Sequence, residues 1–136
     1  MRIARALLDR IVDHARREFP NECCGFVGTR DGTATEVAEV ENVAASPFRF
    51  DIEPHVLLRT VTAIEDRGDD VGAIYHSHTR SAPYPSQTDA NFAAHWPGTE
   101  WLIVGLAGGS EPEVRCFRID DGRIDEVEVE VEAPDG

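Results

Sequence analysis

Residues 71–89, VGAIYHSHTRSAPYPSQTD, decide the fold, because they contain a strand, a loop and the start of a helix. The apolar run Val71–Tyr75 predicts a strand that ends in His76-Ser77-His78. Residues two apart on a strand project to the same face, so the two imidazoles can converge on one point. An H-x-H pair alone is a weak signal, because unliganded histidines account for most such pairs.

The segment after this strand supplies an acid. Thr79–Pro85 is a loop with two prolines, and Ser86 is a good N-cap for a short helix. Asp89 follows three residues later, where a carboxylate interacts favourably with the helix dipole. Ten residues lie between His78 and Asp89, enough for the chain to return to the strand end. Two histidines and one carboxylate suit one zinc ion with an open fourth position, although iron and manganese are also compatible.

Outward from this segment, the chain alternates helices and strands. Apolar residues from Ile3 to Ala15 have helical spacing, and Pro20 ends that helix. The order of elements predicts an α/β fold, a mixed sheet flanked by helices in a single domain of residues 1–136. The other expected elements are strands at Cys23–Gly28, Thr33–Glu41 and briefly Phe48–Phe50, a helix capped by Asp51 with Pro54 in its first turn and Gly68 at its exit, a helix from Ser86 to about His95, a strand at Trp101–Leu106, and a hairpin of Val114–Ile119 and Arg123–Val131.

Charge and composition exclude several classes of partner. The chain has 136 residues, with 26 acidic and 13 basic side chains and a net charge of −13. Nucleic-acid binding needs a cationic surface, and anionic lipid repels an acidic one, so we expect neither nucleic acid nor membrane as a partner. No apolar run approaches the ~18 residues of a membrane span, and the first ten residues show no signal-peptide core. The expected location is cytoplasmic.

The acidic charge is concentrated at the C-terminal end. Residues 120–136 carry −7 of the net −13. Valines at 127, 129 and 131 alternate with glutamates, which predicts a strand with one face in water rather than an acidic interaction tail. All 13 basic residues are arginine, and the sequence leaves open whether genome base composition or salt adaptation is the cause.

Two further features bear on chemistry. The three cysteines, Cys23, Cys24 and Cys116, are too few for a disulfide framework and are expected to be buried small hydrophobic residues. Glu22 precedes the Cys23–Gly28 strand, and a carboxylate there could act as a general base toward water. Taken alone, Glu22 is more typical of a surface acid, and sequence spacing does not show that it reaches a metal.

At these residues the chain resembles the JAMM (MPN-plus) metalloproteases. Their signature is an upstream Glu, then H-x-H, ten residues and Asp, with Ser three before the Asp. The resemblance implies a curved mixed sheet between helices, related to the cytidine-deaminase fold. It implies that His76, His78 and Asp89 hold Zn²⁺, that Glu22 is general base and then acid, and that the Ser86 hydroxyl binds the oxyanion.

The family usually has Pro after the second His, whereas this chain has Thr79. With the surrounding residues, this departure resembles the small bacterial branch that releases cysteine from a sulfur-carrier protein. The implied partner is a ubiquitin-like or sulfur-carrier protein with a Gly-Gly C-terminus, cut at the amide bond after that end. A compact archaeal branch that removes ubiquitin-like modifiers from lysines is the alternative. The sequence leaves the oligomeric state open.

Three competing functions fit less well. A non-catalytic MPN scaffold requires missing ligands, and none is missing here. A zinc deaminase on the related fold needs H-x-E and P-C-x-x-C, and the chain has neither motif. A cysteine nucleophile at Cys23 or Cys24 needs an adjacent histidine, which nothing in the sequence places beside either.

Overall fold

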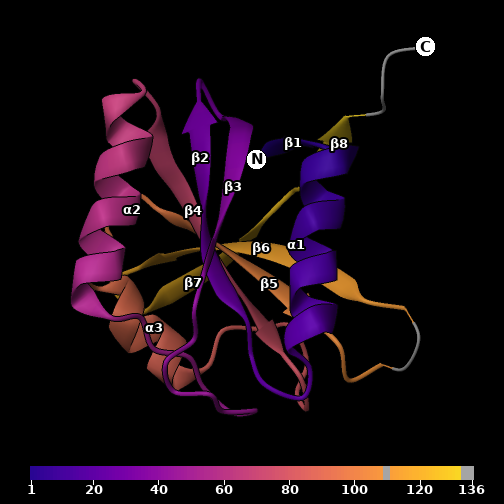
Figure 1. The fold of residues 1–136 in the computed structure, drawn as a ribbon. Helices are drawn as coiled ribbons and strands as arrows, with labels where there is room; N and C mark the ends of the chain where they lie inside the picture. The colour runs from indigo at the N-terminus through magenta and orange to yellow at the C-terminus, as the bar shows by residue number, and fades with distance from the viewer. Residues whose placement is uncertain (109–110, 133–136) are drawn as a thin grey trace.

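A mixed β-sheet lies at the centre of the computed structural model, which describes residues 1–108 and 111–132 (Figure 1). Helix α1 covers one face of the sheet, and α2 and α3 cover the other. The helices are α1 (Arg5–Glu18), α2 (Pro54–Asp66) and α3 (Gln87–Ala93). The strands are β1 (Arg2–Ala4), β2 (Cys24–Arg30), β3 (Thr33–Val40), β4 (Asp70–His78), β5 (Glu100–Gly105), β6 (Glu113–Asp120), β7 (Arg123–Val127) and β8 (Glu130–Glu132). The expected α/β fold, a curved mixed sheet flanked by helices, is confirmed.

The sheet curls back on itself. Its strand order within the described residues is β7-β6-β5-β4-β2-β3-β1-β8, so β7 and β8 lie at opposite edges. Only residues 128 and 129 separate these two strands, and therefore the edges must come close together. The prediction of one continuous last strand, Arg123–Val131, is wrong: β7 pairs with β6, whereas β8 crosses to the other edge and pairs with β1.

The valine–glutamate alternation nevertheless has the expected effect. Val127, Val129 and Val131 are partly buried and pack against the core on the α1 face. Glutamates at 126, 128, 130 and 132 are exposed. Asp135, the last acid of this segment, lies outside the described residues.

Two hydrophobic clusters fill the two faces of the sheet. The first lies under α1 and includes Leu8, Ile11 and Tyr75. The second lies under α2 and α3 and includes Ile64 and Trp101. Because side chains alternate along a strand, the adjacent cysteines divide between the clusters, Cys23 in the first and Cys24 in the second.

Two local predictions between β3 and α2 need correction, and one strand at the N-terminus was not predicted. Glu53 rather than Asp51 caps α2, because its carboxylate accepts the Val56 N–H at 3.0 Å. Phe48–Phe50 is not a strand; the loop that contains it is held by side-chain hydrogen bonds instead of a ladder. The short strand β1 was not predicted, and three residues are too few to show a period.

None of the described helices combines the length and apolarity needed to cross a membrane.

Candidate metal centre

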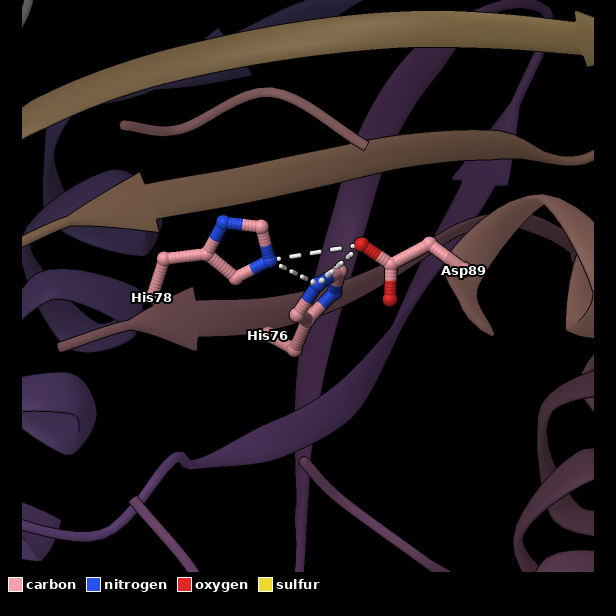
Figure 2. A group of neighbouring side chains, drawn as sticks. All are labelled: His76, His78 and Asp89. Atoms are coloured by element: carbon pink, nitrogen blue, oxygen red, sulfur yellow. Dashed lines mark hydrogen bonds and ion pairs between the residues drawn. The ribbon is translucent and has the colours of Figure 1, made fainter. Parts of the chain in front are cut away.

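Three side chains meet at the end of β4 (Figure 2). His76 and His78 lie at the C-terminal end of β4, and their side chains project to the same face of the strand, as their spacing predicted. Asp89 reaches them from the first turn of α3. The Nε2 atoms of the two histidines lie 3.0 Å apart, and Oδ2 of Asp89 lies 3.1 Å from His76 and 3.3 Å from His78.

These distances suit a metal ion. Zinc binds nitrogen and oxygen ligands at about 2.0–2.2 Å in a tetrahedron, whose ligand atoms are then about 3.3–3.5 Å apart. Two of the observed separations, 3.0 and 3.1 Å, lie slightly below this range, and the third, 3.3 Å, lies at its lower limit. All three side chains are buried, so a cation between them would neutralise the carboxylate and occupy the imidazole lone pairs. The donor set of two imidazoles and a carboxylate therefore fits a divalent metal such as zinc.

A backbone carbonyl orients one of the two imidazoles. Nδ1 of His78 donates to the carbonyl oxygen of Ala82 at 2.8 Å, so the proton lies on Nδ1 and the Nε2 lone pair faces the other ligands. His76 is fully buried, with its ring 4.8 Å from that of Phe50 and 6.2 Å from that of Trp101. Packing therefore fixes His76, because its Nδ1 has no hydrogen-bond partner among the described residues.

Asp89 belongs to a capping box as well as to this cluster. Its backbone N–H donates to Oγ of Ser86 at 3.1 Å, and its Oδ2 accepts the Ser86 N–H at 2.9 Å. The predicted cap is confirmed, and it holds the carboxylate still at the cluster. Burial alone would raise the pKa of Asp89, but His76, His78 and the Ser86 N–H hold it well below its ordinary value. Asp89 is therefore ionised, as a metal ligand must be.

Antiparallel pairing brings Glu22 to the same place. Strands β2 and β4 pair with Cys24 opposite His76, and this register puts Glu22 level with His78. Glu22 is only 5% exposed, so the expectation that Glu22, taken alone, is a surface acid is wrong. Burial raises the pKa of Glu22 to about 7; the nearby His78 opposes this shift and Asp89 adds to it. A carboxyl with such a pKa can both accept and donate a proton near neutrality.

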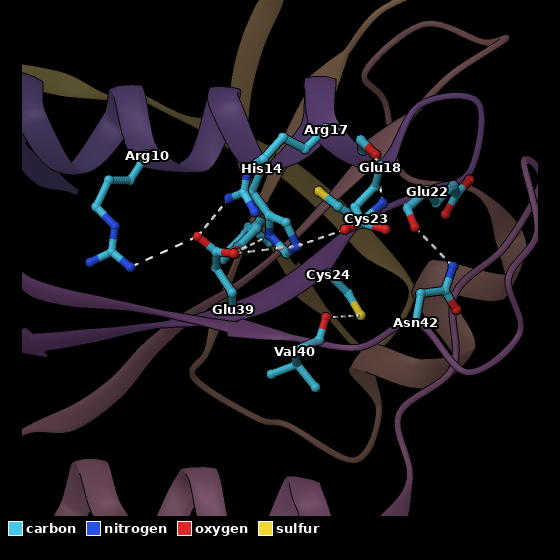
Figure 3. Close-up of polar contacts among 12 residues, drawn as sticks. Arg10, His14, Arg17, Glu18, Glu22, Cys23, Cys24, Glu39, Val40 and Asn42 are labelled. Atoms are coloured by element: carbon cyan, nitrogen blue, oxygen red, sulfur yellow. Dashed lines mark hydrogen bonds and ion pairs between the residues drawn. The ribbon is translucent and has the colours of Figure 1, made fainter.

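Asn42 was missed by the sequence analysis, and it organises the loop between β3 and α2. Its amide nitrogen donates to the carbonyl oxygens of Glu22 at 2.9 Å and Arg49 at 3.1 Å. Its amide oxygen accepts the N–H groups of Ala44 and Asp51, each at 3.0 Å. Figure 3 shows the Asn42 side chain turned toward the Glu22 backbone. No local pattern in the sequence marks this residue.

A cleft of about 320 Å³ opens beside the cluster. Glu22, His78, Ser86 and Asp89 all line it, so four of the five residues singled out from the sequence face one space. The hydroxyl of Ser86 accepts the Asp89 N–H and keeps its own proton to donate. The other lining residues are Pro47, Phe48, Arg49, Phe50, Arg80, Ser81, Thr88 and Phe92.

The cysteines and His14 are separate from this chemistry. All three cysteines are buried, as expected, and burial raises the pKa of each thiol to about 12, so none is a thiolate nucleophile near neutrality. His14 of α1 is hydrogen-bonded through Nδ1 to the Tyr75 hydroxyl at 2.7 Å. In Figure 3 it lies near Glu39, 3.8 Å from His14 Nε2.

Several known proteins are similar to this chain in sequence and in fold. Residues 4–120 match the family described as prokaryotic homologs of the JAB domain. The chain is 32% identical over 127 residues to CysO-cysteine peptidase of Mycobacterium tuberculosis, covering 92% of this chain and 86% of that protein. It is 40% identical over 107 residues to desampylase of Haloferax volcanii, covering 74% and 76%. The solution structure of protein DSY2949 from Desulfitobacterium hafniense has a TM-score of 0.84 at 29% identity, covering 98% and 93%. The chain therefore belongs to the prokaryotic JAB-domain family, and its expected membership of the JAMM/MPN proteins is confirmed.

Proposed function

We propose that this protein is a zinc-dependent peptidase that hydrolyses the amide bond after the C-terminal Gly-Gly of a ubiquitin-like or sulfur-carrier protein. The observation that carries the proposal is the convergence of three ligand atoms within 3.0–3.3 Å of one another, beside a buried glutamate. One metal with three protein ligands and an open position is the arrangement of catalytic rather than structural zinc. His76, His78 and Asp89 would hold the ion.

The residues of the chain divide the reaction between them. When bound, zinc supplies Lewis-acid polarisation of the scissile carbonyl and lowers the pKa of water. Glu22 accepts a proton from the attacking water and passes it to the leaving amine. The Ser86 hydroxyl donates a hydrogen bond to the oxyanion of the tetrahedral intermediate. The products are a carboxylate and a free amine.

Release of cysteine from a sulfur carrier is the first candidate reaction. It is supported by the relative named CysO-cysteine peptidase, whose similarity covers 92% of this chain. Removal of a ubiquitin-like modifier from lysine is the second candidate, supported by the 40% identity to desampylase over a shorter span. A non-catalytic scaffold has no support, since the ligand set and the candidate base are both present.

The decisive experiment compares two substrates with zinc-loaded protein. One is a Gly-Gly sulfur carrier extended by a single C-terminal cysteine, and the other is a ubiquitin-like protein joined to a lysine side chain. Cleavage of the first confirms the first candidate, whereas release from only the second supports the desampylase-like reaction. Cleavage of neither would contradict the proposed function.

A substitution at the base separates catalysis from metal binding. Glu22→Gln should keep one zinc per chain by elemental analysis but lower turnover by about 10²–10⁴-fold, because an amide cannot shuttle protons. Near-normal turnover of that variant would remove Glu22 from the mechanism.

A further inference from the structure

Two arginines line the cleft beside the candidate metal centre, Arg49 on one loop and Arg80 on another. Seven of the 13 arginines form ion pairs within the described residues, but these two are not among them. The acids that line the cleft are Glu22 and Asp89, and both are already assigned to the reaction. A chain with a net charge of −13 therefore keeps two arginines at this cleft that form no ion pair with any carboxylate in residues 1–108 and 111–132.

The loops that carry the two arginines are fastened to each other. The hydroxyl of Thr79 donates to the carbonyl oxygen of Pro47 at 2.8 Å. The guanidinium of Arg80 lies 5.3 Å from the centre of the Phe48 ring, a cation–π distance. Asn42 holds the other loop through the Arg49 carbonyl at 3.1 Å. Thr79 stands where the family usually has proline, and a proline would lack the hydroxyl that joins the loops.

Such a pair of arginines matches a carboxylate. The planar guanidinium presents a rigid fork of N–H donors that binds both oxygens of a carboxylate, and it stays charged at any working pH. A cysteine attached to a carrier through its α-amine has its own carboxylate one carbon from the leaving nitrogen. A lysine joined through its side chain has no carboxylate close to that nitrogen. Two arginines at the cleft can therefore distinguish the two leaving groups.

We propose that Arg49 and Arg80 bind the α-carboxylate of the leaving group, so that the enzyme prefers a C-terminal amino acid to a lysine side chain. This inference rests on the proposed function and specifies its substrate class. It assigns the two residues to specificity rather than to proton transfer, since Glu22 already supplies the base. The preference arises because the two arginines contact the α-carboxylate, which is not part of the bond that is cleaved, in both the ground state and the transition state.

The test uses two substrates that differ only in this carboxylate. A ubiquitin-like domain ending in Gly-Gly-Cys is prepared with a free C-terminal carboxylate and, separately, as the C-terminal carboxamide. Zinc-loaded wild-type protein should cleave the carboxylate form with a kcat/KM about 10- to 100-fold higher, the range for hydrogen bonds to a charged group. Arg49→Gln and Arg80→Gln should each reduce that ratio markedly, because the loss of kcat/KM should be larger on the carboxylate form than on the carboxamide.

A matched control and the contrary outcomes complete the design. Arg59→Gln replaces an exposed arginine of α2 that does not line the cleft, and it should leave the ratio at the wild-type value. Equal cleavage of the two substrates by wild type, or an equal loss on both in the Arg49 and Arg80 variants, would overturn the inference alone. Cleavage of neither substrate by wild type would overturn the proposed function, and the inference with it.

Discussion

Asn42 provides a sharp test of how the structure holds its candidate base. The side chain is half-buried and uses all its hydrogen-bonding capacity on the backbone, two N–H donations and two acceptances. One donated hydrogen bond fixes the carbonyl of Glu22. The other donated bond and the two accepted bonds fix the loop that carries Arg49. Asn42→Ala removes all four hydrogen bonds, and Asn42→Asp removes the two donations while keeping the acceptors.

The expected loss of stability follows from this count. A hydrogen bond within a folded protein contributes about 0.5–1.5 kcal/mol net, and the two bonds nearer solvent belong at the low end. Asn42→Ala should therefore lower the free energy of unfolding by about 2–4 kcal/mol. Asn42→Asp should lower it by about half as much, with an added penalty because its charge would lie against two carbonyl oxygens. Turnover should fall in both variants while the zinc content stays at the wild-type value, because Asn42 supports the backbone of Glu22 and makes no hydrogen bond to the candidate ligands His76, His78 and Asp89 within the described residues.

Urea unfolding measures the first effect, and elemental analysis with an activity assay measures the second. Asn91→Ala is the matched control, since Asn91 is exposed and, in the part of the chain that the structure describes, its side chain is hydrogen-bonded only to that of Gln87, one turn away in α3. That control should change stability by less than about 0.5 kcal/mol. A loss below about 0.5 kcal/mol in Asn42→Ala, or full turnover in both Asn42 variants, would refute the role given to this side chain.

Three further predictions follow from the core. Gly25→Ala should destabilise the fold by about 1–3 kcal/mol in urea unfolding, because a Cβ at this position would lie 2.4 Å from the Tyr75 ring; an unchanged midpoint would contradict this contact. The three buried thiols, with pKa values of about 12, should resist a thiol reagent in the native protein at pH 8 and react on unfolding, and rapid native labelling would be the contrary result. Burial, only partly offset by Glu39, lowers the pKa of His14 from 6.5, so the unfolded state binds its proton more tightly and stability should fall as the pH drops through 6.5. His14→Gln should weaken that pH dependence in urea unfolding between pH 7.5 and 5.5, and identical slopes would exclude His14 as its source.

Local rules predicted the parts of the site that lie close together along the chain. The two-residue spacing of His76 and His78 places them on one face of a strand, whatever the rest of the fold does. Ser86 and Asp89 form a capping box because a helix start leaves N–H groups that nearby side chains must satisfy. The division of Cys23 and Cys24 between two cores follows from the same alternation as the histidines.

Long-range pairing decided the features that the sequence analysis missed or misjudged. Glu22 taken alone is typical of a surface acid, and only the antiparallel register of β2 against β4 buries it beside His78. The last predicted strand breaks because its second half completes the opposite edge of the sheet, next to β1. Asp51 is a good capping residue, but Asn42 accepts its backbone N–H and the helix begins later, at the cap supplied by Glu53.

The sequence by itself therefore determined the spacing of the candidate ligands His76, His78 and Asp89 and the elements that carry them, since helix and strand periods act within a few residues. Its net charge of −13 also predicts that nucleic acid is not a partner. Tertiary structure alone decided which side chains share the cleft: Glu22, His78, Ser86 and Asp89 line it together with Arg49 and Arg80. The reason is physical, because the pKa of a carboxyl and the reach of a guanidinium depend on burial and on neighbours that lie tens of residues away in the chain.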